Sequence, residues 1–198
     1  MLPDLSRPVA ELAPLLLGCV VRHESEAGPV ALVLTEVEAY DGENDRASHA
    51  YRGHTERNAV MFGRAGRLYV YRSHGLHWCA NIVTGSEGTA SAVLLRAGRV
   101  IDGADLARVR RGERVEDRRL ARGPGNLCQA LGITAEHNGA ELTGRADLSL
   151  TPGKPIPAER VLSGPRVGVS RGHDEPWRFW IAGEPSVSAY RLSPRAPK

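Results

Sequence analysis

The chain has little lysine, few aromatic residues and few cysteines. Lys154 and Lys198 are its only lysines among 26 basic residues, and aromatic residues make up 5% of the 198 positions. Arginine suits phosphate because one guanidinium binds two oxygens, but a general preference for arginine produces the same composition without any nucleic acid. Because aromatic residues are scarce, a place where they cluster is informative.

The three cysteines, Cys19, Cys79 and Cys128, lie far apart and include no CxxC pair. This spacing argues against a disulfide framework and against a zinc–thiolate site. No apolar run reaches the about 18 residues that a membrane span requires. Asp4 and Glu11 lie where a signal peptide would be basic or apolar. We therefore expect a cytoplasmic protein with no signal peptide and no membrane association.

The remaining composition is that of an ordinary globular domain. Hydrophobic residues make up 41% and charged residues 25%, with a net charge of +3. The length fits one domain, so we expect residues 1–198 to form a single domain. Nine arginines and five acidic residues lie between Arg96 and Arg122. This basic stretch is typical of a phosphate-binding surface, or of a solvated helix with internal ion pairs.

Apolar spacing and turn residues predict short strands and helices along the chain. Residues 41–58 contain almost nothing to bury and predict a long loop. The economical fold class is α+β: one curved, mainly antiparallel sheet resembling an open barrel, with flanking helices and a protruding β-hairpin. The expected elements are a helix over 5–16 bent by Pro8 and Pro14, strands at 19–22, 30–40, 90–97, 166–170 and 177–182, and helices at 102–121 and 127–131.

Residues 66–83 predict the hairpin, with two strand-like runs joined by the turn Arg72–Gly75. Tyr69 and Tyr71 are two positions apart, so both rings leave one face of a strand. Gly75 tolerates the positive φ of a tight turn, and His74 stands beside it at the exposed tip. Such a hairpin is compatible with insertion into a nucleic acid and with simple packing.

Glu36, Glu38 and Tyr40 alternate with apolar residues, so they project from one face at the polar end of a predicted strand. Two carboxylates spaced in this way are about 7 Å apart, a separation found in inverting sugar hydrolases. Two other interpretations are a pair of solvated edge acids and a site that breaks an N-glycosidic bond.

Cleavage of a purine N-glycosidic bond requires a carboxylate that stabilises oxocarbenium charge and deprotonates water, and Glu38 fits this role. Arg96, on a neighbouring predicted strand, would keep Glu38 ionised and help to position the water. An electron-poor base requires aromatic rings on both of its faces for stacking and cation–π attraction. Tyr40, Tyr71 and His49 are the candidates.

A base inside a duplex must be rotated out, and a side chain at a hairpin tip can fill the gap that it leaves. His74 occupies that position. His74 and His77 also form an HxxH pair, but on a strand or turn their rings point to opposite faces, so we expect no metal site. Gly123–Asn126 precedes the last helix and predicts either a capped turn or a phosphate site.

The chain resembles the alkyladenine type of DNA-3-methyladenine glycosylase (methylpurine DNA glycosylase) from about Leu15 to Leu192. No single motif of this resemblance is specific to the family, but the set of motifs in this order is specific. The matching segments are TEVEAY at 35–40, RASHAYRG at 46–53, RNAVMFGRAGRLYVY at 57–71, HGLHWCANIV at 74–83, AVLLRA at 92–97, GPGNLCQALGI at 123–133 and RVGVS at 166–170.

The resemblance implies a monofunctional enzyme that flips alkylated purines out of double-stranded DNA and hydrolyses the N-glycosidic bond, starting base excision repair. It implies that Glu38 activates water with Arg96 as partner, and that Asn81 lines the pocket and excludes the exocyclic amine of guanine. It also implies no cofactor, no metal and no covalent lysine intermediate, and we expect a monomer. The family commonly carries tyrosine at the hairpin tip, whereas this chain has His74.

By the same resemblance, Tyr40, His49 and Tyr71 form the base-binding sandwich and His74 is the wedge in the DNA. Two hypotheses from other classes remain: a non-catalytic nucleic-acid-binding module on the same scaffold, and a soluble sugar hydrolase that uses Glu36 and Glu38.

Overall fold

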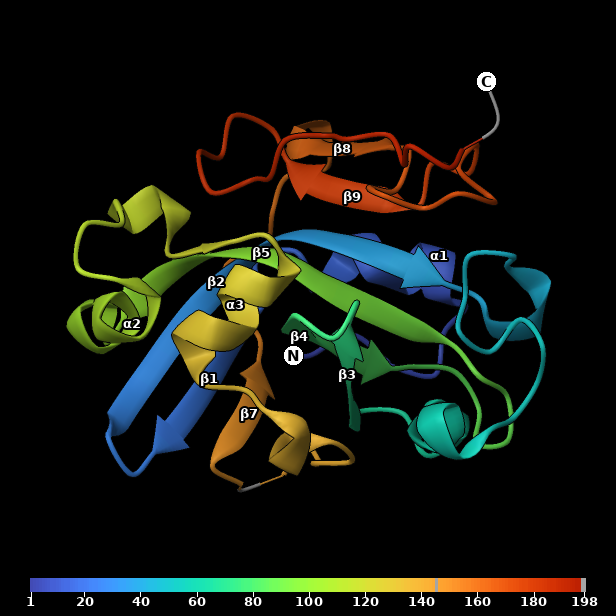
Figure 1. Ribbon diagram of the computed structural model, residues 1–198, viewed down its shortest axis with the longest axis horizontal. Coiled ribbons are helices and arrows are strands. Elements are labelled where there is room, and N and C mark those ends of the chain that lie inside the picture. The colour runs from blue at the N-terminus through green and yellow to red at the C-terminus, as the bar shows by residue number, and fades with distance from the viewer. Residues whose placement is uncertain (145, 197–198) are drawn as a thin grey trace.

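In the described part of the chain, nine β-strands form one antiparallel sheet (Figure 1). The structure is a computed structural model that describes residues 1–144 and 146–196. The strands are β1 Val20–Ser25, β2 Gly28–Tyr40, β3 Leu68–Ser73, β4 His77–Val83, β5 Ala92–Asp102, β6 Ala121–Arg122, β7 Leu148–Thr151, β8 Val161–Gly164 and β9 Arg178–Ile181.

Short helices and single 3-10 turns complete the fold. None of the helices in the described part of the chain is long and apolar enough to cross a membrane. The α-helices are α1 Val9–Leu12, α2 Ala104–Arg111 and α3 Pro124–Leu131, and the 3-10 helices are η1 Ala13–Leu16, η2 Gly42–Asn44, η3 Glu56–Phe62, η4 Asp117–Arg119, η5 Ala135–His137 and η6 Ala158–Arg160.

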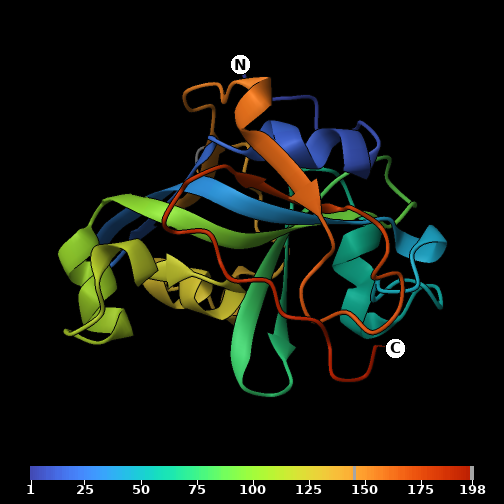
Figure 2. The ribbon, with the colours of Figure 1, turned by 90° about the horizontal axis from the view of Figure 1, so that it is seen from above.

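The strand order is β3-β4-β5-β2-β1-β7, with β6 beside β5, β9 beside β2, and β8 beside β9. Every pairing between these strands is antiparallel. The sheet curves but does not close, so the predicted α+β class with a mainly antiparallel open sheet is confirmed. Figure 2 shows α1 on one side of β2 and β5, with α2, α3 and the tip of the β3–β4 hairpin on the other.

Strand β2 changes partner along its length, and this change creates the site. Its first half pairs with β1 as far as Val33, whereas Glu36–Glu38 pair with β9. Its pairing with β5 is irregular on both sides of Glu36, where Thr35 and Arg96 are skipped in the register. Bulges bend a strand and redirect side chains, and they are frequent beside active sites. Apolar Val37 and Ala39 nevertheless stay in the core, so the acidic residues project from the opposite face.

The hairpin extends away from the body of the molecule, as Figure 2 shows. Its turn places His74 at a φ of 49° and Gly75 at 70°, and Leu76 donates its N–H to the carbonyl of Ser73. A positive φ is unusual for histidine. Leu76 is 77% exposed although it is a large apolar side chain. The predicted exposed tip is confirmed, and it carries an apolar side chain next to the histidine.

Several expected boundaries are wrong for identifiable reasons. The helix expected over 102–121 ends at Arg111, because Gly112 has a φ of 111° and leaves the helical region. Residues 166–170 form no strand, because the backbone N–H of Val167 and the side chain of Arg166 bond to other parts of the chain. The short strands β7 and β8 were not expected. Proline limits the first helix, since Pro8 precedes α1 and Pro14 lies in η1.

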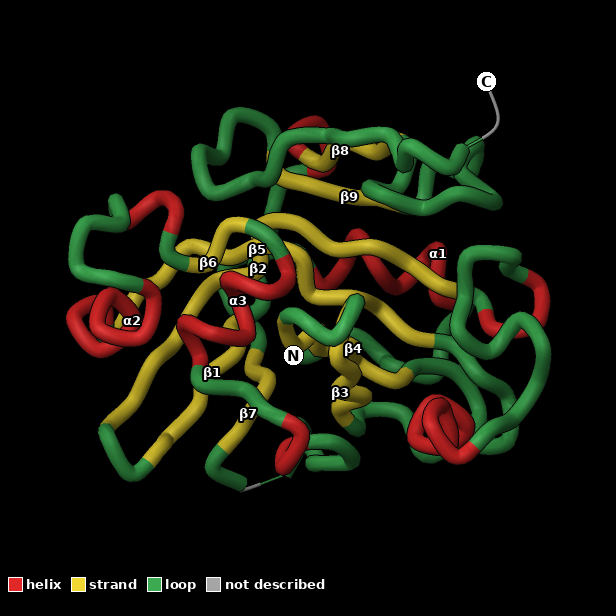
Figure 3. The backbone as a smooth tube through the Cα atoms, viewed as in Figure 1, coloured by secondary structure: helices red, strands yellow, loops and turns green. Residues whose placement is uncertain are grey.

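The loop over 41–58 is irregular, but it buries more than its composition suggests. Figure 3 shows it as a long loop interrupted by a helical turn. Ala50 is fully buried in a second small core with Met61 and Tyr69, beneath the loop. Buried Asn58 closes the segment by donating to the carbonyls of His49 and Gly53, at 3.0 Å in each case. The loop is therefore anchored, and it forms a wall rather than a disordered flap.

Two histidines fasten the outer edge of the hairpin to the body. The carbonyl of Leu131 can only accept, so His23 Nδ1, 2.7 Å away, carries the proton. The N–H of Thr134 can only donate, so His137 Nδ1 is the acceptor. His137 Nε2 therefore donates to His23 Nε2 across 3.2 Å. This chain of hydrogen bonds requires both rings to be neutral. It holds the segment after Thr134 in place, and in that segment Asn138 accepts from the N–H of Val70 in β3.

We predict that the free energy of unfolding decreases as the pH falls below about 6.5, the ordinary pKa of histidine. Burial lowers the pKa of His137, and the neighbouring His23 adds to this effect. The unfolded chain therefore takes up protons first, and acidification favours unfolding. Urea denaturation between pH 7.5 and 5 measures this dependence. His137→Gln should reduce it, and the exposed His54→Gln should not; equal slopes in both variants would contradict the prediction.

Candidate active site

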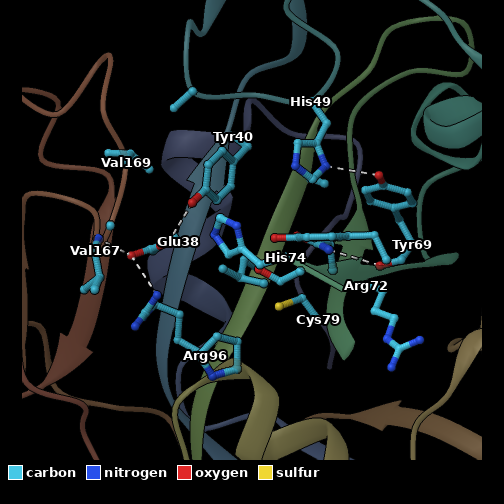
Figure 4. A pocket seen from close by; sticks show the side chains of 18 of the residues that line it. Glu38, Tyr40, His49, Tyr69, Arg72, His74, Cys79, Arg96, Val167 and Val169 are labelled. Atoms are coloured by element: carbon cyan, nitrogen blue, oxygen red, sulfur yellow. Dashed lines mark hydrogen bonds and ion pairs between the residues drawn. The ribbon is translucent and has the colours of Figure 1, made fainter. Parts of the chain in front are cut away.

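A cavity of about 750 Å³ opens between the end of β2, the hairpin, the loop after β2 and residues 167–171. Its lining includes every residue predicted for the glycosylase site, although they come from four strands, one turn and one loop. Those residues are Glu38, Tyr40, His49, Tyr71, His74, Asn81 and Arg96. Figure 4 shows Tyr40 and His49 on opposite sides of this cavity, with Glu38 and Arg96 below Tyr40.

Glu38 is fully buried at one end of the cavity and is surrounded by donors. The hydroxyl of Tyr40 donates to Oε2 at 2.8 Å, and the backbone N–H of Val167 donates to Oε1 at 2.7 Å. Arg96 Nη1 lies 3.4 Å from Oε1 (Figure 4). Hydrogen bonds and a cation stabilise the ionised form of a carboxylate and compensate for its burial. Glu38 is therefore a fixed anion that faces the cavity, not a solvated edge acid.

Arg96 lies between two carboxylates. Its Nε donates to Glu36 Oε1 at 3.0 Å and its Nη2 donates to Ser188 Oγ at 3.1 Å. Burial lowers the pKa of Arg96, but the negative charges of Glu38 and Glu36 outweigh this effect and raise the pKa above its ordinary value. The guanidinium is a permanent cation, held between the sheet and the cavity.

Glu36 does not line the cavity. Its Oε1 accepts from Arg96, from Arg178 Nε at 2.7 Å and from Ser188 Oγ at 2.9 Å, while its Oε2 accepts from the backbone N–H of Ser188 at 2.7 Å. A fully buried carboxylate with four donors is poorly placed to exchange protons with a substrate. This geometry argues against a sugar hydrolase that uses Glu36 and Glu38 as its acid and base.

Aromatic rings form two walls of the cavity. His49 packs edge-on against Tyr71, with ring centroids 4.4 Å apart, and Tyr71 stacks on Tyr69 at 5.6 Å. His49 Nδ1 lies 3.1 Å from the hydroxyl of Tyr69 (Figure 4). His49 faces the open cavity, yet loss of surrounding water lowers its pKa, with a smaller contribution from Arg57, which favours a neutral ring. Tyr69 is also part of this wall.

Tyr40 forms the opposite wall. Burial raises the pKa of Tyr40 well above the ordinary value, and the charge of Glu38 raises it further. The phenol therefore stays protonated and donates a hydrogen bond to Glu38. Asn81, 5% exposed, lies further along the cavity, and its Nδ2 donates to the carbonyl of Tyr69 at 3.0 Å. This bond orients the amide on β4. The walls are thus rigid before any ligand enters.

Arg166 is the residue that sequence reasoning missed. It is fully buried, and its guanidinium lies over the rings of Tyr40, at 4.7 Å, and Trp177, at 5.2 Å. It pairs with Asp45 in a bidentate manner, with Nη2–Oδ1 at 2.8 Å. The same side chain donates to the carbonyls of Ala39 and Gly172. Arg166 therefore connects the Tyr40 wall, the loop after β2 and the segment that presents the N–H of Val167.

A signal for Arg166 exists in the sequence, because RVGVS is one of the family-like segments. The apolar alternation of this segment predicts a strand, however. No local sequence pattern indicates that Arg166 pairs with Asp45, which lies 121 positions earlier. The contact of Val167 with Glu38 could not be predicted from residue type, because its donor is a backbone N–H that every residue except proline carries.

Several cations surround the mouth of the cavity. Arg46, Arg57, Arg72 and Arg171 all contribute to its lining. Pro124, at the start of α3, lies there too, and a Cβ placed on Gly125 would come within 2.6 Å of His77. The GPGN segment therefore packs directly against His77, where β4 begins at the tip end of the hairpin.

Most arginines of the basic stretch over 96–122 bond to other groups of the same chain. Arg108 pairs with Asp105 and Asp117 at 2.6 and 2.5 Å, and Arg118 pairs with Glu116 at 2.7 Å. Three further arginines donate to backbone carbonyls; they are Arg110, Arg111 and Arg122. These contacts favour the interpretation of the stretch as a surface with internal pairs.

Comparisons with known proteins agree with this geometry. The family model described as "Methylpurine-DNA glycosylase (MPG)" matches residues 4–185. A protein of Nocardia farcinica is 54% identical over 92% of this chain and 87% of its own length. One of Streptomyces avermitilis is 50% identical over 94% and 89%, and one of Mycobacterium tuberculosis is 51% identical over 96% and 93%. All three are named "Putative 3-methyladenine DNA glycosylase".

We predict that Arg166→Met destabilises the protein by about 3–5 kcal/mol, because it leaves the Asp45 carboxylate buried and unpaired. Urea denaturation at pH 7.5 measures the loss. The double variant Arg166→Met/Asp45→Leu removes both charges, so it should lose clearly less than the single variant. A double variant as unstable as Arg166→Met would show that the ion pair is not the reason.

Proposed function

We propose, since the chain belongs to the methylpurine-DNA glycosylase family, that it excises alkylated purines such as 3-methyladenine from double-stranded DNA by hydrolysis. The observation that carries this proposal is Glu38: a buried carboxylate, fixed by three donors, at the end of a cavity walled by aromatic rings. We further propose that residues 1–198 act as one glycosylase domain.

The aromatic walls support binding of a flat, electron-poor base. A purine rotated into the cavity would lie between Tyr40 on one side and His49 with Tyr71 on the other. Alkylation at N3 or N7 gives the purine a positive charge, and stacking on electron-rich rings is strongest for such a base. A neutral His49 suits this role, because it adds no positive charge to the wall.

The carboxylate supports the hydrolytic step. Water attacks the sugar carbon as its bond to the base nitrogen breaks, Glu38 takes the water proton, and the base leaves with the bonding electron pair. A cationic base leaves as a neutral molecule, so it requires little help from an acid. Glu38 also stabilises the oxocarbenium charge, and Arg96 keeps Glu38 ionised. The products are a free base and an abasic site, with the strand intact.

The hairpin and Asn81 support recognition in duplex DNA. His74 stands at the tip, where it would fill the space left by the rotated base, and exposed Leu76 supplies the apolar surface that wedging side chains commonly provide. Asn81 would crowd the 2-amino group that distinguishes guanine from adenine. The partner of the protein is therefore double-stranded DNA that carries damaged bases.

A non-catalytic DNA-binding module is the second candidate. A binding surface does not require a fully buried carboxylate with three donors, so Glu38 favours the enzyme. Release of base from damaged DNA separates the two candidates directly.

We predict that Glu38→Gln lowers base release at least 10³-fold, because glutamine takes up no proton. The assay incubates a duplex that contains one methylated purine and then cleaves abasic sites with alkali. Binding of the same duplex, measured by fluorescence anisotropy, should be retained, and Glu26→Gln, an exposed acid in the β1–β2 turn, should behave as the native chain does. Full base release by Glu38→Gln would refute the proposed mechanism.

We predict that His74→Ala and Leu76→Ala each lower the single-turnover rate on duplex DNA by roughly 10-fold, because the rotated base then leaves an unfilled gap that costs stacking energy. A single-stranded oligonucleotide with the same lesion has no stack to restore, so its rate should change less than threefold. Arg64→Ala, on an exposed surface outside the cavity, serves as control. Equal losses on both substrates would assign the tip a different role.

A further inference from the structure

Glu36 contacts Arg96 on the side that faces away from the cavity. The distance from Arg96 Nε to Glu36 Oε1 is 3.0 Å, whereas the distance from Arg96 Nη1 to Glu38 Oε1 is 3.4 Å. Arg96 is therefore bound more closely by the carboxylate outside the cavity than by the one inside it.

The choice of guanidinium edge matters. An arginine binds a carboxylate most strongly through two parallel N–H groups. In this site Arg96 Nε donates to Glu36 and Arg96 Nη2 donates to Ser188 Oγ, so the two-donor edge formed by these groups is not turned to Glu38, which lies 3.4 Å from Nη1. A two-bond pair with Arg96 would occupy Glu38 and weaken it as a proton acceptor. In the observed arrangement Arg96 lies close enough to stabilise the charge of Glu38, but it does not form the two-bond pair that would weaken Glu38 as a proton acceptor.

The C-terminal segment holds Glu36 in place. Arg178 on β9 donates to Glu36 Oε1 and, through Nη2, to the carbonyl of Ser188 at 2.8 Å. The N–H of Ser188 donates to Glu36 Oε2. Figure 1 shows β9 running alongside the last part of β2, so this support comes from a part of the chain about 140 residues away in sequence.

We propose that Glu36 is a positioning residue, which together with Ser188 holds the Nε–Nη2 edge of Arg96 so that Glu38 remains free to accept the proton of the attacking water. This inference rests on the proposed function, because it assumes that Glu38 is the base. Arg178 and Ser188 complete the device by fixing Glu36.

The charges around Glu38 determine how removal of the Glu36 charge changes the ionisation of Glu38. Removing one negative charge leaves an excess of positive charge beside Glu38, which favours its ionised form to lower pH. Arg96, released from Glu36, turns its two-donor edge to Glu38. The charged and titratable groups that act on Glu38 are Tyr40 from β2, Tyr71 from β3, Cys79 from β4, Arg96 from β5 and Arg166 before Val167, and behind Arg96 lie Glu36 and its partner Arg178 from β9.

The test is the pH profile of Glu36→Gln under single-turnover conditions, on a duplex with one methylated purine. We expect the plateau rate to fall roughly 10- to 100-fold because the reacting groups are displaced. We expect the acidic limb of the profile to move to lower pH, because the charge of Glu36 is lost. A merely structural role would lower the active fraction without moving the limb. An unchanged rate constant and an unchanged limb in the active fraction would overturn the proposal.

Ser188→Ala tests the same device without changing any charge. It removes the hydroxyl that bonds to Glu36 and Arg96, so the plateau rate should fall about three- to tenfold, while the acidic limb stays in place. If Glu36→Gln does not fold, this variant decides, and a rate within twofold of the native rate overturns the proposal. Glu184→Gln, on the same segment but paired with Arg99, is the matched control.

Failure of this inference is distinguishable from failure of the proposed function. Base release by Glu38→Gln would refute both. A native profile for Glu36→Gln, together with an inactive Glu38→Gln, would refute only the positioning role.

Discussion

The neutralisation of buried carboxylates by buried arginines is the interaction on which the rest of the site depends. A buried ion is costly unless it is paired and hydrogen-bonded, so each of these charges requires a partner at a defined place. The partners lie on different elements, and pairing them draws the end of β2, the loop after it and the C-terminal segment together. The set comprises Glu36, Glu38 and Asp45 with Arg96, Arg178 and Arg166.

Strand β2 provides the geometry for these pairs. Its alternation sends Val37 and Ala39 into the core and Glu36 and Glu38 to the opposite face, while the irregular register beside Arg96 bends the sheet at that point. The exchange of β1 for β9 as partner brings Arg178 to Glu36. A regular sheet would have placed the same residues on a flat surface, where water would screen the charges.

Local patterns were sufficient to predict the candidate side chains. Alternation placed Glu38 and Tyr40 on one face, and the ring pair of Tyr69 and Tyr71 followed from their spacing. His49 was a candidate ring from the loop, and only the family-like motifs added Asn81; no periodicity indicates either residue. The open antiparallel sheet and the exposed hairpin tip were also predictable, since both depend on short-range apolar spacing and turn residues. The helix expected over 102–121 failed because the glycine at 112 ends it, and neighbouring charged residues could not reveal this.

The sequence by itself determined which chemical groups the protein carries and which of them share a strand face, because side-chain alternation is a local property. Only the tertiary structure decided which groups meet. Arg166 pairs with Asp45 across 121 positions, and Glu36 takes Arg178 and Ser188 from the last part of the chain. It also decided that Glu36 supports the site while Glu38 faces it. The two acids look equivalent in the sequence, and the difference arises from the partners that burial brings to each.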